Sequence, residues 1–554
     1  MTQLGISAFY HDSAACLLID GKVVYAVEEE RFSEIKHDSS FPIRSILWVL
    51  AQAGIQDINQ VDEICWYEDP KIKKNRVLKT FNKRFFSTFK NRFKYLKNYY
   101  LNSPEKLLKK HFKYTGKIIY VDHHLSHAAF SYYTSPFNQA AILTVDGVGE
   151  WETITISRVL KDGKIEKFFD IKFPNSLGML YSTITAFLGF KPNEGEYKVM
   201  GLAPYGNPDR YYEKLNSIFD RTSNKFTIDQ KYFTWEYSDK IMFNIELCKL
   251  LDLPPRFKGE EFTQDHKDLA AALQKIYETE FLKLVQIAKN FTKLDNLCLG
   301  GGCAYNGVAN SKAYKYFNHI HIPFAPSDAG SAIGACLQSY KGPKKDNTSP
   351  FLGPEYSDQS VINMLEREKI KHKVYTTESV CRQTANYIKE GKIVAWFQGR
   401  MEFGARALGN RSILANPSIP EMREKLNLVI KKREGFRPFA PSVLKSHQSK
   451  YFKIIEDIPY MNQVVDASGK FPAATHIDGT SRVHTVTAKQ NKKYYRLLQY
   501  VEKLTGDPVV LNTSFNLKDQ TITMSPEQAL SRYLSSDIDV LVLGNVIIEK
   551  NGRR

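Results

Sequence analysis

A pattern of strands and tight turns occurs twice in this chain and restricts the folds that it can adopt. The first copy consists of apolar runs and one Asp-Gly pair, at residues 5–9, 14–19, 20–21 and 22–28. The second copy has the same order, at residues 141–145, 152–160, 162–163 and 164–169. Asp-Gly between two apolar runs is a strong hairpin signal. We therefore predict an α/β fold with a duplicated domain and a ligand between its halves, with chance recurrence of a common turn as the alternative.

The stretch 117–150 combines two histidines in helical register with a carboxylate at the end of a strand. His123 and His127 lie four residues apart in a segment whose composition suits a helix, so their imidazoles would share one face. Asp146 and Asp328 each follow a predicted strand. Imidazole and carboxylate ligands without thiolate suit Fe(II), Mn(II) or Zn(II), of which we expect Fe(II) first. A set of hydrogen-bonded histidines in a helix cap is the alternative, and the residues alone leave both open.

One segment carries most of the net charge. The formal charge is +17, and residues 71–114 contain 15 Lys and Arg against one acid, Glu105, so the rest of the chain is nearly neutral. An argument from overall charge for nucleic-acid binding therefore fails, and we expect no nucleic-acid partner. Apolar side chains recur in this segment at mostly helical spacing, at Leu78, Phe81, Phe85, Phe89, Phe93, Leu96 and Tyr100. We predict a basic helical arm docked through its aromatic face, with peripheral contact to an anionic membrane or a polyanion as the alternative.

Glycine-rich loops follow strands in both parts of the chain. A glycine triplet at 300–302, before a helix near Asn306, suits close approach to phosphate or adenosine, although glycines also form plain turns. The polar segment 341–354 is rich in Pro and Gly and predicts a domain boundary. Beyond it, glycine-rich loops carry separated basic residues, at Arg400, Arg406, Arg411, Lys432, Arg433, Arg437 and Arg482. Several guanidinium groups in such loops favour a pocket for several phosphates over surface salt bridges.

Composition and length narrow the class of protein. The chain has 554 residues, enough for two or more domains with their own cores. We see no secretory signal at its start and no apolar run long enough to span a bilayer. The seven cysteines are scattered without a CxxC pair, which favours free thiols in a reducing compartment. We expect a cytoplasmic protein.

Eleven motifs follow one another along nearly the whole chain, apart from the basic arm and the linker. They are GISAFYHDSAACLL, EEERFSEIKHDSSFP, VDHHLSHAAFSYY, TVDGVGE, GEYKVMGLAPYG, LGGGCAYN, PSDAGSAIGA, GRMEFGARALGNRSI, REGFRPFAPS, THIDGTSRV and LNTSFN. In this order they resemble the motifs of the NodU/CmcH family of O-carbamoyltransferases. The resemblance implies an actin-like (ASKHA) transfer domain at 1–345, similar to Kae-type threonylcarbamoyl transferases, and an α+β YrdC-like domain at 355–554. Members of this family carbamoylate hydroxyl groups of Nod factors, cephalosporins, aminoglycosides and other acceptors.

The resemblance also implies a reaction in two steps. In the YrdC-like domain, carbamoyl phosphate and ATP, with Mg, would form carbamoyladenylate and pyrophosphate. In the actin-like domain the carbamoyl group would pass to a hydroxyl of the acceptor, and AMP would leave. A natural product, a Nod-factor-like molecule and a surface polysaccharide all fit as the acceptor, and the sequence does not choose among them.

Carried over to this sequence, the family motifs imply a set of site residues. The metal ligands would be His123, His127, Asp146 and Asp328. His11 and Lys36 match positions near the transferred carbamoyl group, and His11 or Asp12 would act as the general base or form part of a structural loop. The transfer site would hold the adenylate with Gly147, Gly149, Glu196, Lys198, Gly201, Gly301, Gly302 and Asn306. ATP and carbamoyl phosphate would contact Arg400, Arg406, Arg411, Lys432, Arg433, Arg437, Arg482, Asn512 and Ser514.

Two other classes of function compete with this interpretation. A threonylcarbamoyl-type tRNA-modifying enzyme shares the domain types and would use the basic arm, but the fused C-terminal module speaks against it. An actin-like nucleotide-binding regulator has no need of two complete sites. A homodimer is an open alternative to a monomer.

Overall fold

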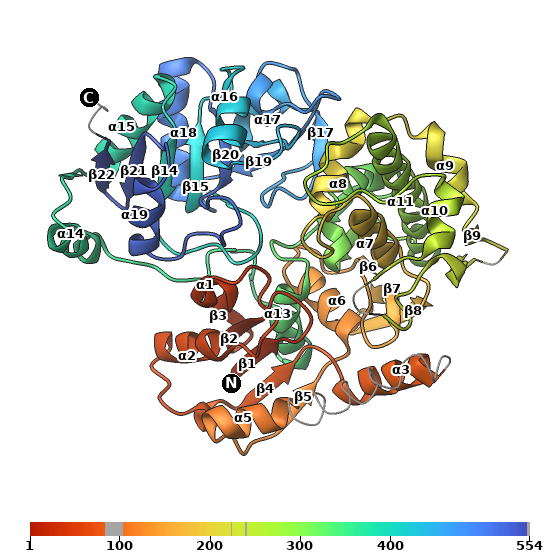
Figure 1. The fold of residues 1–554 in the computed structure, drawn as a ribbon. Helices are drawn as coiled ribbons and strands as arrows, with labels where there is room; N and C mark the ends of the chain where they lie inside the picture. Colours follow the sequence, from red (N-terminus) through yellow and green to blue (C-terminus); the bar gives the residue numbers. More distant parts are fainter. Residues whose placement is uncertain (83–102, 223, 239–240, 551–554) are drawn as a thin grey trace. The chain divides into compact units, whose positions relative to one another are not determined.

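The computed structural model describes residues 1–82, 103–222, 224–238 and 241–550, and it divides into two compact units (Figure 1). Unit 1 comprises Met1–Glu29 and Ser39–Thr348. Unit 2 comprises Glu30–Asp38 and Ser349–Arg554. The segment 30–38 therefore leaves unit 1 and returns to it, whereas the sequence predicts an N-terminal domain without interruption.

Unit 1 contains two five-stranded sheets that repeat one strand order. The order is β3-β2-β1-β4-β5 in the first sheet and, read from the matching edge, β8-β7-β6-β11-β12 in the second. In both sheets the first three strands pair antiparallel and the last two add in parallel. The strands are β1 (Thr2–Ser7), β2 (Ala14–Ile19), β3 (Lys22–Glu28), β4 (Glu63–Trp66), β5 (Ile118–Tyr120), β6 (Ala141–Val145), β7 (Glu152–Val159), β8 (Ile165–Lys172), β11 (Asn296–Gly300) and β12 (His319–His321). The repeated topology confirms the duplication that the hairpin pattern predicts.

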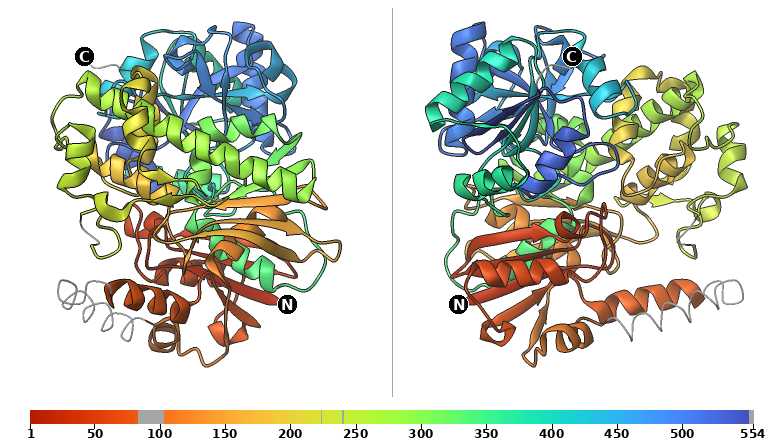
Figure 2. Two further views of the ribbon diagram at one scale, coloured as in Figure 1. Left: turned by 90° about the vertical axis from the view of Figure 1, so that its right-hand side faces the viewer. Right: turned by 60° about the vertical axis from the view of Figure 1, so that its left-hand side comes forward.

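Helices cover both faces of these sheets. Strands such as β6 are therefore buried along their whole length. α2 (Ile43–Gln52) and α13 (Asp328–Ser339) pack on the first sheet, and α6 (His123–Tyr133) and α11 (Gln264–Thr292) pack on the second (Figure 2). α6 and α13 also pack on each other. The remaining elements of unit 1 are α3 (Pro70–Asn82), α5 (Pro104–Phe112), α7 (Leu177–Phe187), α8 (Glu196–Leu202), α9 (Asp209–Asn216), α10 (Ile245–Leu251), α12 (Gly307–Lys312), β9 (Phe219–Asp220) and β10 (Thr227–Ile228).

The contact between α6 and α13 is close because α13 carries glycines there. A Cβ built on Gly334 would lie 1.9 Å from the carbonyl oxygen of Ser126, and one on Gly330 would lie 2.4 Å from Cε1 of Phe130, both on α6. Asp122 caps α6 by accepting a hydrogen bond from the backbone N–H of Leu125 at 3.0 Å. The packing of the two helices therefore sets the relative position of the residues with which they begin.

Unit 2 is built on one eight-stranded mixed sheet, ordered β13-β22-β21-β14-β15-β20-β16-β19. Side chains alternate between its faces: Ala395 and Phe397 enter one apolar core, and Val394 and Trp396 enter another. The strands are β13 (Lys373–Val374), β14 (Val394–Phe397), β15 (Arg411–Ala415), β16 (Ala440–Leu444), β19 (His484–Val486), β20 (Val509–Ser514), β21 (Val540–Leu543) and β22 (Val546–Glu549), beside the pair β17 (Val464–Asp466) and β18 (Thr480–Arg482). The helices are α1 (Glu30–Ser33), α14 (Asp358–Arg367), α15 (Thr377–Lys389), α16 (Met422–Glu424), α17 (Gln448–Tyr451), α18 (Lys492–Thr505) and α19 (Pro526–Leu534).

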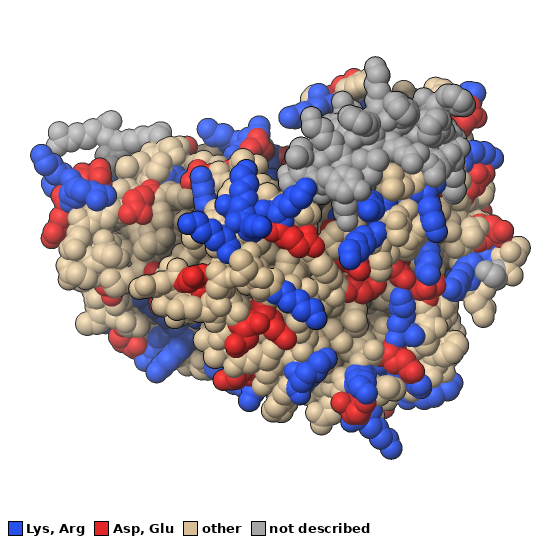
Figure 3. All heavy atoms as spheres, turned by 90° about the horizontal axis from the view of Figure 1, so that it is seen from below, with Lys and Arg blue, Asp and Glu red and all other residues tan. Residues whose placement is uncertain are grey.

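Two helices, α3 and α5, are the described parts of the predicted basic arm. On α3, Arg76 is buried with its guanidinium carbon 5.1 Å from the ring centre of Phe173, and Lys79 Nζ lies 5.8 Å from that of Trp151. Figure 3 shows Lys and Arg side chains gathered in groups on one face of the molecule, with acidic side chains among them. The predicted aromatic positions Phe81, Phe85, Phe89, Phe93, Leu96 and Tyr100 lie outside the residues whose side chains are described. Both the docking of the arm and its contact with a membrane or polyanion therefore stay predictions.

Within the described ranges, no helix is both long enough and apolar enough to cross a membrane.

Replacing Gly334 with Ala is expected to lower the free energy of unfolding by roughly 1–3 kcal/mol, because the added Cβ forces α6 and α13 apart. Gly435→Ala is the control, since nothing lies within 4 Å of a Cβ built on Gly435. Denaturant unfolding of both variants measures the difference. Equal stability of the two variants would show that the helix contact is not as tight as described.

Candidate functional site

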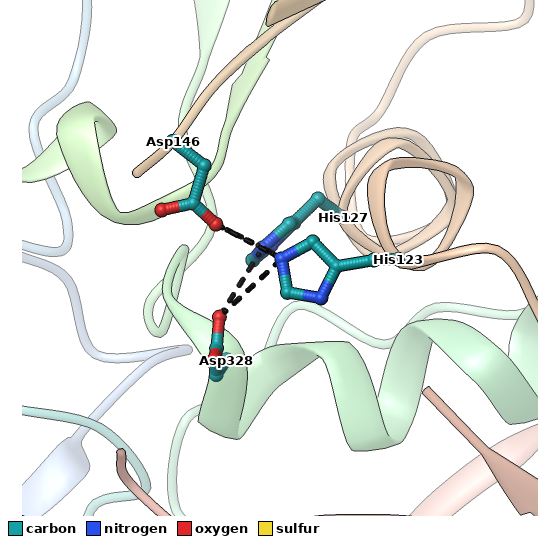
Figure 4. Close-up of side chains that lie close together, drawn as sticks. All are labelled: His123, His127, Asp146 and Asp328. Carbon is teal, nitrogen blue, oxygen red and sulfur yellow. Dashed lines mark hydrogen bonds and ion pairs between the residues drawn. The ribbon is translucent and has the colours of Figure 1, made fainter. Parts of the chain in front are cut away.

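Four side chains from three elements of unit 1 point at one place (Figure 4). His123 and His127 stand on α6, Asp146 follows β6, and Asp328 begins α13. The Nε2 atoms of His123 and His127 lie 3.0 and 2.9 Å from Asp146 Oδ2, and 3.7 and 3.5 Å from Asp328 Oδ1. All four residues are buried. The structure thus brings together the four residues predicted as metal ligands.

The arrangement of these polar atoms fits a metal ion. One ligand atom from each residue lies within 4.8 Å of all the others. The two Nε2 atoms face each other at 3.1 Å, and among the described residues neither oxygen of Asp328 has a hydrogen-bond partner. Buried polar atoms left in this way are costly, and a divalent cation would satisfy them together. The two imidazoles and two carboxylates suit Fe(II), Mn(II) or Zn(II).

A neighbouring hydroxyl orients one of these imidazoles. Ser331 Oγ lies 2.9 Å from His127 Nδ1, on the ring nitrogen away from the cluster. A partner on Nδ1 leaves Nε2 for a metal, as is usual for metal-binding histidines. Ser331 lies one turn into α13, so the helix that supplies Asp328 also positions His127.

The third histidine of the motif is not part of this cluster. His124 lies 2.7 Å from Thr144 Oγ1 through Nδ1 and 3.0 Å from the carbonyl oxygen of Glu152 through Nε2. Burial and the charge of His123 hold the pKa of His124 well below its usual range. His124 is therefore a neutral side chain that ties α6 to the second sheet.

The cluster contains strongly shifted groups. Burial opposes the ionisation of Asp146, but hydrogen bonds from His123 and His127 outweigh it and hold the Asp146 pKa well below its usual range. Burial lowers the pKa of His123, but the charge of Asp328 and the hydrogen bond to Asp146 raise it to about 9 overall. Without a metal, protons occupy the positions that a cation would take.

His11 and Asp12 form a pair whose histidine is influenced by the charges of Asp146 and Asp328. His11 Nδ1 lies 3.0 Å from Asp12 Oδ2, and Ser327 Oγ donates to the same oxygen at 3.4 Å. Asp12 has a φ of 52°, in the left-handed region that few residues other than glycine adopt. Burial lowers the pKa of His11, but the charges of Asp12 and Asp328 raise it to about 10 overall.

The predicted adenylate-binding glycines shape the surroundings of Asp146. Asp146 Oδ1 accepts hydrogen bonds from the backbone N–H groups of Gly147, at 2.8 Å, and Gly302, at 3.3 Å. Gly301 has a φ of 87°, and a Cβ there would lie 2.2 Å from the carbonyl oxygen of Val145. At Gly149, a Cβ would come within 3.0 Å of the His123 ring. These glycines allow the backbone to close around the carboxylate.

The other predicted adenylate residues have partners of their own. Glu196, at the start of α8, accepts hydrogen bonds from Ser182 Oγ at 2.6 Å and from the N–H of Asn193 at 2.8 Å. Lys198 Nζ lies 5.1 Å from the ring centre of Phe190. Gly201 lies inside α8, and Asn306 caps α12 while exchanging hydrogen bonds with Gln274. Their contact with an adenylate stays a prediction.

In unit 2, one predicted phosphate ligand has a different role. The guanidinium of Arg411 is fully buried, stacks 3.6 Å from the ring centre of Phe397, and donates to the carbonyl oxygens of Gln398, Gly399, Asn410 and Pro354. Arg400 likewise donates to the carbonyl oxygen of Leu352 at 2.6 Å. These carbonyl oxygens accept the guanidinium N–H groups that would otherwise bind a phosphate. Arg411 thus stabilises the Gly-rich loop, contrary to the prediction.

Lys431, which is not among the predicted residues, turns inward, whereas the predicted phosphate ligand Lys432 is exposed. Lys431 Nζ is buried and donates to the carbonyl oxygens of Ser514, at 2.6 Å, and Asn516, at 2.8 Å. Burial and the charges of Arg433 and Arg437 hold the pKa of Lys431 well below its usual range. Lys432 is exposed and has a φ of 45°. Two adjacent lysines give no sequence signal to decide which one turns inward.

The remaining predicted residues of unit 2 lie in four places. Arg433 Nε donates to Asn427 at 2.8 Å, and Arg437 lies 3.5 Å from Glu434. Asn512 donates to Ser442 and to the carbonyl oxygen of Ala407, and Ser514 donates to Asn516. Arg482 ends β18, and its charge is one cause, after burial, of the His476 pKa of about 4. Arg406 stands in the Gly-rich loop before β15.

Lys36, which the resemblance places near the transferred carbamoyl group, belongs to the segment 30–38 of unit 2.

Comparisons with known proteins point to one family over the whole chain. A family model described as Carbamoyltransferase N-terminus matches residues 2–337, and one described as Carbamoyltransferase C-terminus matches residues 385–550. An uncharacterized protein of Synechocystis sp. is 37% identical over 99% of this chain and 97% of its own length. The nodulation protein NolNO of Sinorhizobium fredii is 34% identical over 98% of this chain and 80% of its own length. NolO of Bradyrhizobium diazoefficiens is 33% identical over 78% of this chain and 79% of its own.

The purified protein is expected to bind one divalent transition metal per chain, and His127→Ala with Asp328→Asn is expected to abolish this binding. The double variant removes one imidazole and one carboxylate of a four-residue site. His319→Ala is the control, because His319 is exposed and lies outside the cluster. Metal analysis by mass spectrometry measures the stoichiometry. Equal metal content in the double variant and in the control would refute the assignment.

Removal of the metal is expected to make stability depend on pH. The His123 pKa of about 9 in the folded apoprotein exceeds its usual value of 6.5. Protonated His123 therefore stabilises the apoprotein fully below pH 6.5, and this contribution is lost as the pH rises through 9. Melting temperatures of chelator-treated protein should fall over this window, and His123→Gln should flatten the fall. Metal affinity should rise over the same window, since binding displaces protons.

Proposed function

This chain belongs to the carbamoyltransferase family, and from this premise we propose that it is an ATP-dependent O-carbamoyltransferase with one site in each unit. The observation that carries the proposal is the contrast between the sites. Unit 1 has buried carboxylates and imidazoles gathered around one point, and unit 2 has a buried lysine among arginines. The first set suits a cation and the second suits phosphate groups. The family matches do not favour a tRNA-modifying enzyme.

We assign the first step to unit 2, for which we propose a YrdC-like fold. Carbamoyl phosphate, ATP and one water would give carbamoyladenylate there: water cleaves carbamoyl phosphate to carbamate and phosphate, and a carbamate oxygen displaces pyrophosphate from the α-phosphorus of ATP. Lys431, Arg433 and Arg437 supply positive charge in one neighbourhood, which would neutralise the phosphates and orient them. Mg would accompany ATP as it does in other nucleotide sites.

We assign the second step to unit 1, for which we propose an actin-like fold. His123, His127, Asp146 and Asp328 would hold a divalent metal, which when bound polarises a carbonyl oxygen or lowers the pKa of a hydroxyl. The backbone amides of Gly147 and Gly302 keep the carboxylate of Asp146 in place.

In the same unit, the His11–Asp12 pair is the candidate proton acceptor for the hydroxyl of the acceptor. Asp12 lies on His11 Nδ1, which leaves Nε2 of His11 for the substrate. A cation bound by Asp146 and Asp328 would offset two of the charges that raise the His11 pKa, and would therefore lower that pKa, while the charge of Asp12 would still raise it.

The acceptor is a hydroxyl-bearing small molecule or glycan. Formation of an adenylate before transfer has a physical advantage. The carbamoyl group is then attached to a nucleotide, which a protein can bind and position. The described cysteines are all free, as is usual for proteins of the reducing cytoplasm. We expect this chain to bind ATP and carbamoyl phosphate in that compartment.

The two half-reactions are expected to fail independently. His127→Ala should abolish carbamoylation of the acceptor but leave ATP–pyrophosphate exchange dependent on carbamoyl phosphate largely intact. Arg437→Ala should depress both activities by on the order of a hundredfold, since a lost charged contact to phosphate costs roughly 2–4 kcal/mol. Isotope exchange and mass spectrometry of the acceptor measure the two steps. The reverse pattern would assign the steps to the opposite units.

A further inference from the structure

A short segment of the N-terminal part of the chain belongs to unit 2. Residues 30–38 group with unit 2, while Glu29 and Ser39 on either side belong to unit 1. Within unit 1, the N–H of Glu29 donates to the carbonyl oxygen of Ser13 at 2.8 Å, and the N–H of Phe9 donates to that of Ser39 at 2.9 Å. Both ends of the segment are therefore fixed, and its nine residues form a defined excursion.

Hydrogen bonds to residues far along the chain hold the excursion in unit 2. Arg31, with a side chain only 2% exposed, donates from Nη2 to the carbonyl oxygen of Gly404 at 3.0 Å. Glu34 accepts from the side-chain amide of Gln528 on α19 at 2.5 Å. Arg31 also pairs with Glu30 at 2.6 Å, so its charge is balanced inside the segment.

The backbone around Lys36 adopts an unusual conformation. Glu34 has a φ of 58° and His37 a φ of 52°, both in the left-handed region. Residues other than glycine reach this region at an energetic cost and stay there only where the surroundings require it. Ile35 is 61% exposed, so burial of an apolar side chain does not explain the bend. Lys36 lies between these two residues, so the bend determines the course of the backbone around it.

Lys36 lies near a group of cations, namely Lys431, Arg433, Arg437 and Arg532. A chain of hydrogen bonds runs through this region: Lys431 to Asn516, Thr523 to Phe515, and Arg532 to Thr523. Arg532 stands on α19, one turn beyond the Gln528 that binds Glu34. Burial lowers the pKa of Lys431, and so do four nearby charges, those of Arg433, Arg437, Lys36 and Arg532. The five cations repel one another, and an anion bound among them would offset this repulsion.

We propose that Lys36 is a phosphate-binding residue of unit 2, contributed to the adenylate-forming site from the N-terminal part of the chain. It would meet the polyphosphate of ATP or the pyrophosphate that leaves. This assignment rests on the proposed function of unit 2. It replaces the expectation that Lys36 serves the transfer site.

The test compares three variants of the full-length protein in ATP–pyrophosphate exchange dependent on carbamoyl phosphate. Lys36→Gln removes the charge and shortens the side chain by only one atom, and Lys36→Arg keeps the charge. Lys518→Gln is the matched control, because Lys518 is an exposed lysine of unit 2 in the loop after Asn516. Lys36→Gln should slow exchange at least tenfold and raise the KM for ATP, Lys36→Arg should restore most of the rate, and Lys518→Gln should match the wild type.

Two results would overturn the assignment. One is normal exchange by Lys36→Gln together with loss of acceptor carbamoylation, which would return Lys36 to the transfer site. The other is an equal loss of exchange in Lys36→Gln and Lys36→Arg with a lowered melting temperature, which would indicate a structural role.

A binding measurement separates the inference from the proposed function. Calorimetric titration with inorganic pyrophosphate and Mg should show at least tenfold weaker binding to Lys36→Gln than to the wild type and to Lys518→Gln. If the wild type catalyses no exchange but this difference appears, the proposed reaction fails while the binding role of Lys36 stands. Equal affinity of Lys36→Gln and the wild type for pyrophosphate would refute the binding role.

Discussion

The burial of two carboxylates and two imidazoles at the junction of three elements is the constraint around which unit 1 is built. Asp146 and Asp328 can stay ionised in a buried place only if opposite charge comes very close to them. The surrounding backbone serves this end: the glycines after β6 and β11 let amide groups reach Asp146. The glycines of α13 let α6 approach until His127 and Asp328 meet. A cluster so arranged is stable only with protons or a cation in its centre.

At its proposed site, unit 2 contains buried positive charge instead of buried negative charge. Its interior holds Lys431 with arginines nearby, and backbone carbonyl oxygens take up the hydrogens of the ammonium. Other cations of the unit are consumed by the fold itself, as Arg411 shows by donating only to carbonyl oxygens. Lys431 and Arg411 both donate to backbone carbonyl oxygens, and what distinguishes Lys431 is the group of cations around it. An excess of buried charge of one sign indicates that a ligand of the opposite charge binds there.

Local patterns predicted the parts of the structure that depend on neighbours in sequence. The two Asp-Gly hairpins gave the duplicated strand order, and the four-residue spacing of His123 and His127 put both on one face of α6. Features that depend on tertiary contact could not be predicted in this way. Lys431 and Lys432 are chemically alike, and only the course of the backbone decides between them. Arg411 has the composition of a ligand, yet the carbonyl groups around it come from segments as distant as Pro354. The placement of residues 30–38 likewise follows from contacts with residues more than 370 positions away, as Arg31 and Gly404 show.

The excursion of nine residues also bears on how such proteins can recombine. The chain crosses between the units after Glu29, before Ser39 and after Thr348, so no single cut separates them. A C-terminal half acquired from a relative would arrive with its sheet but would meet the host's version of residues 30–38. Arg31 and Glu34 would then have to match Gly404 and Gln528 of a foreign partner. Inheritance of the two halves is therefore expected to be linked, and new acceptor specificities should arise by change within unit 1 more readily than by exchange of whole modules.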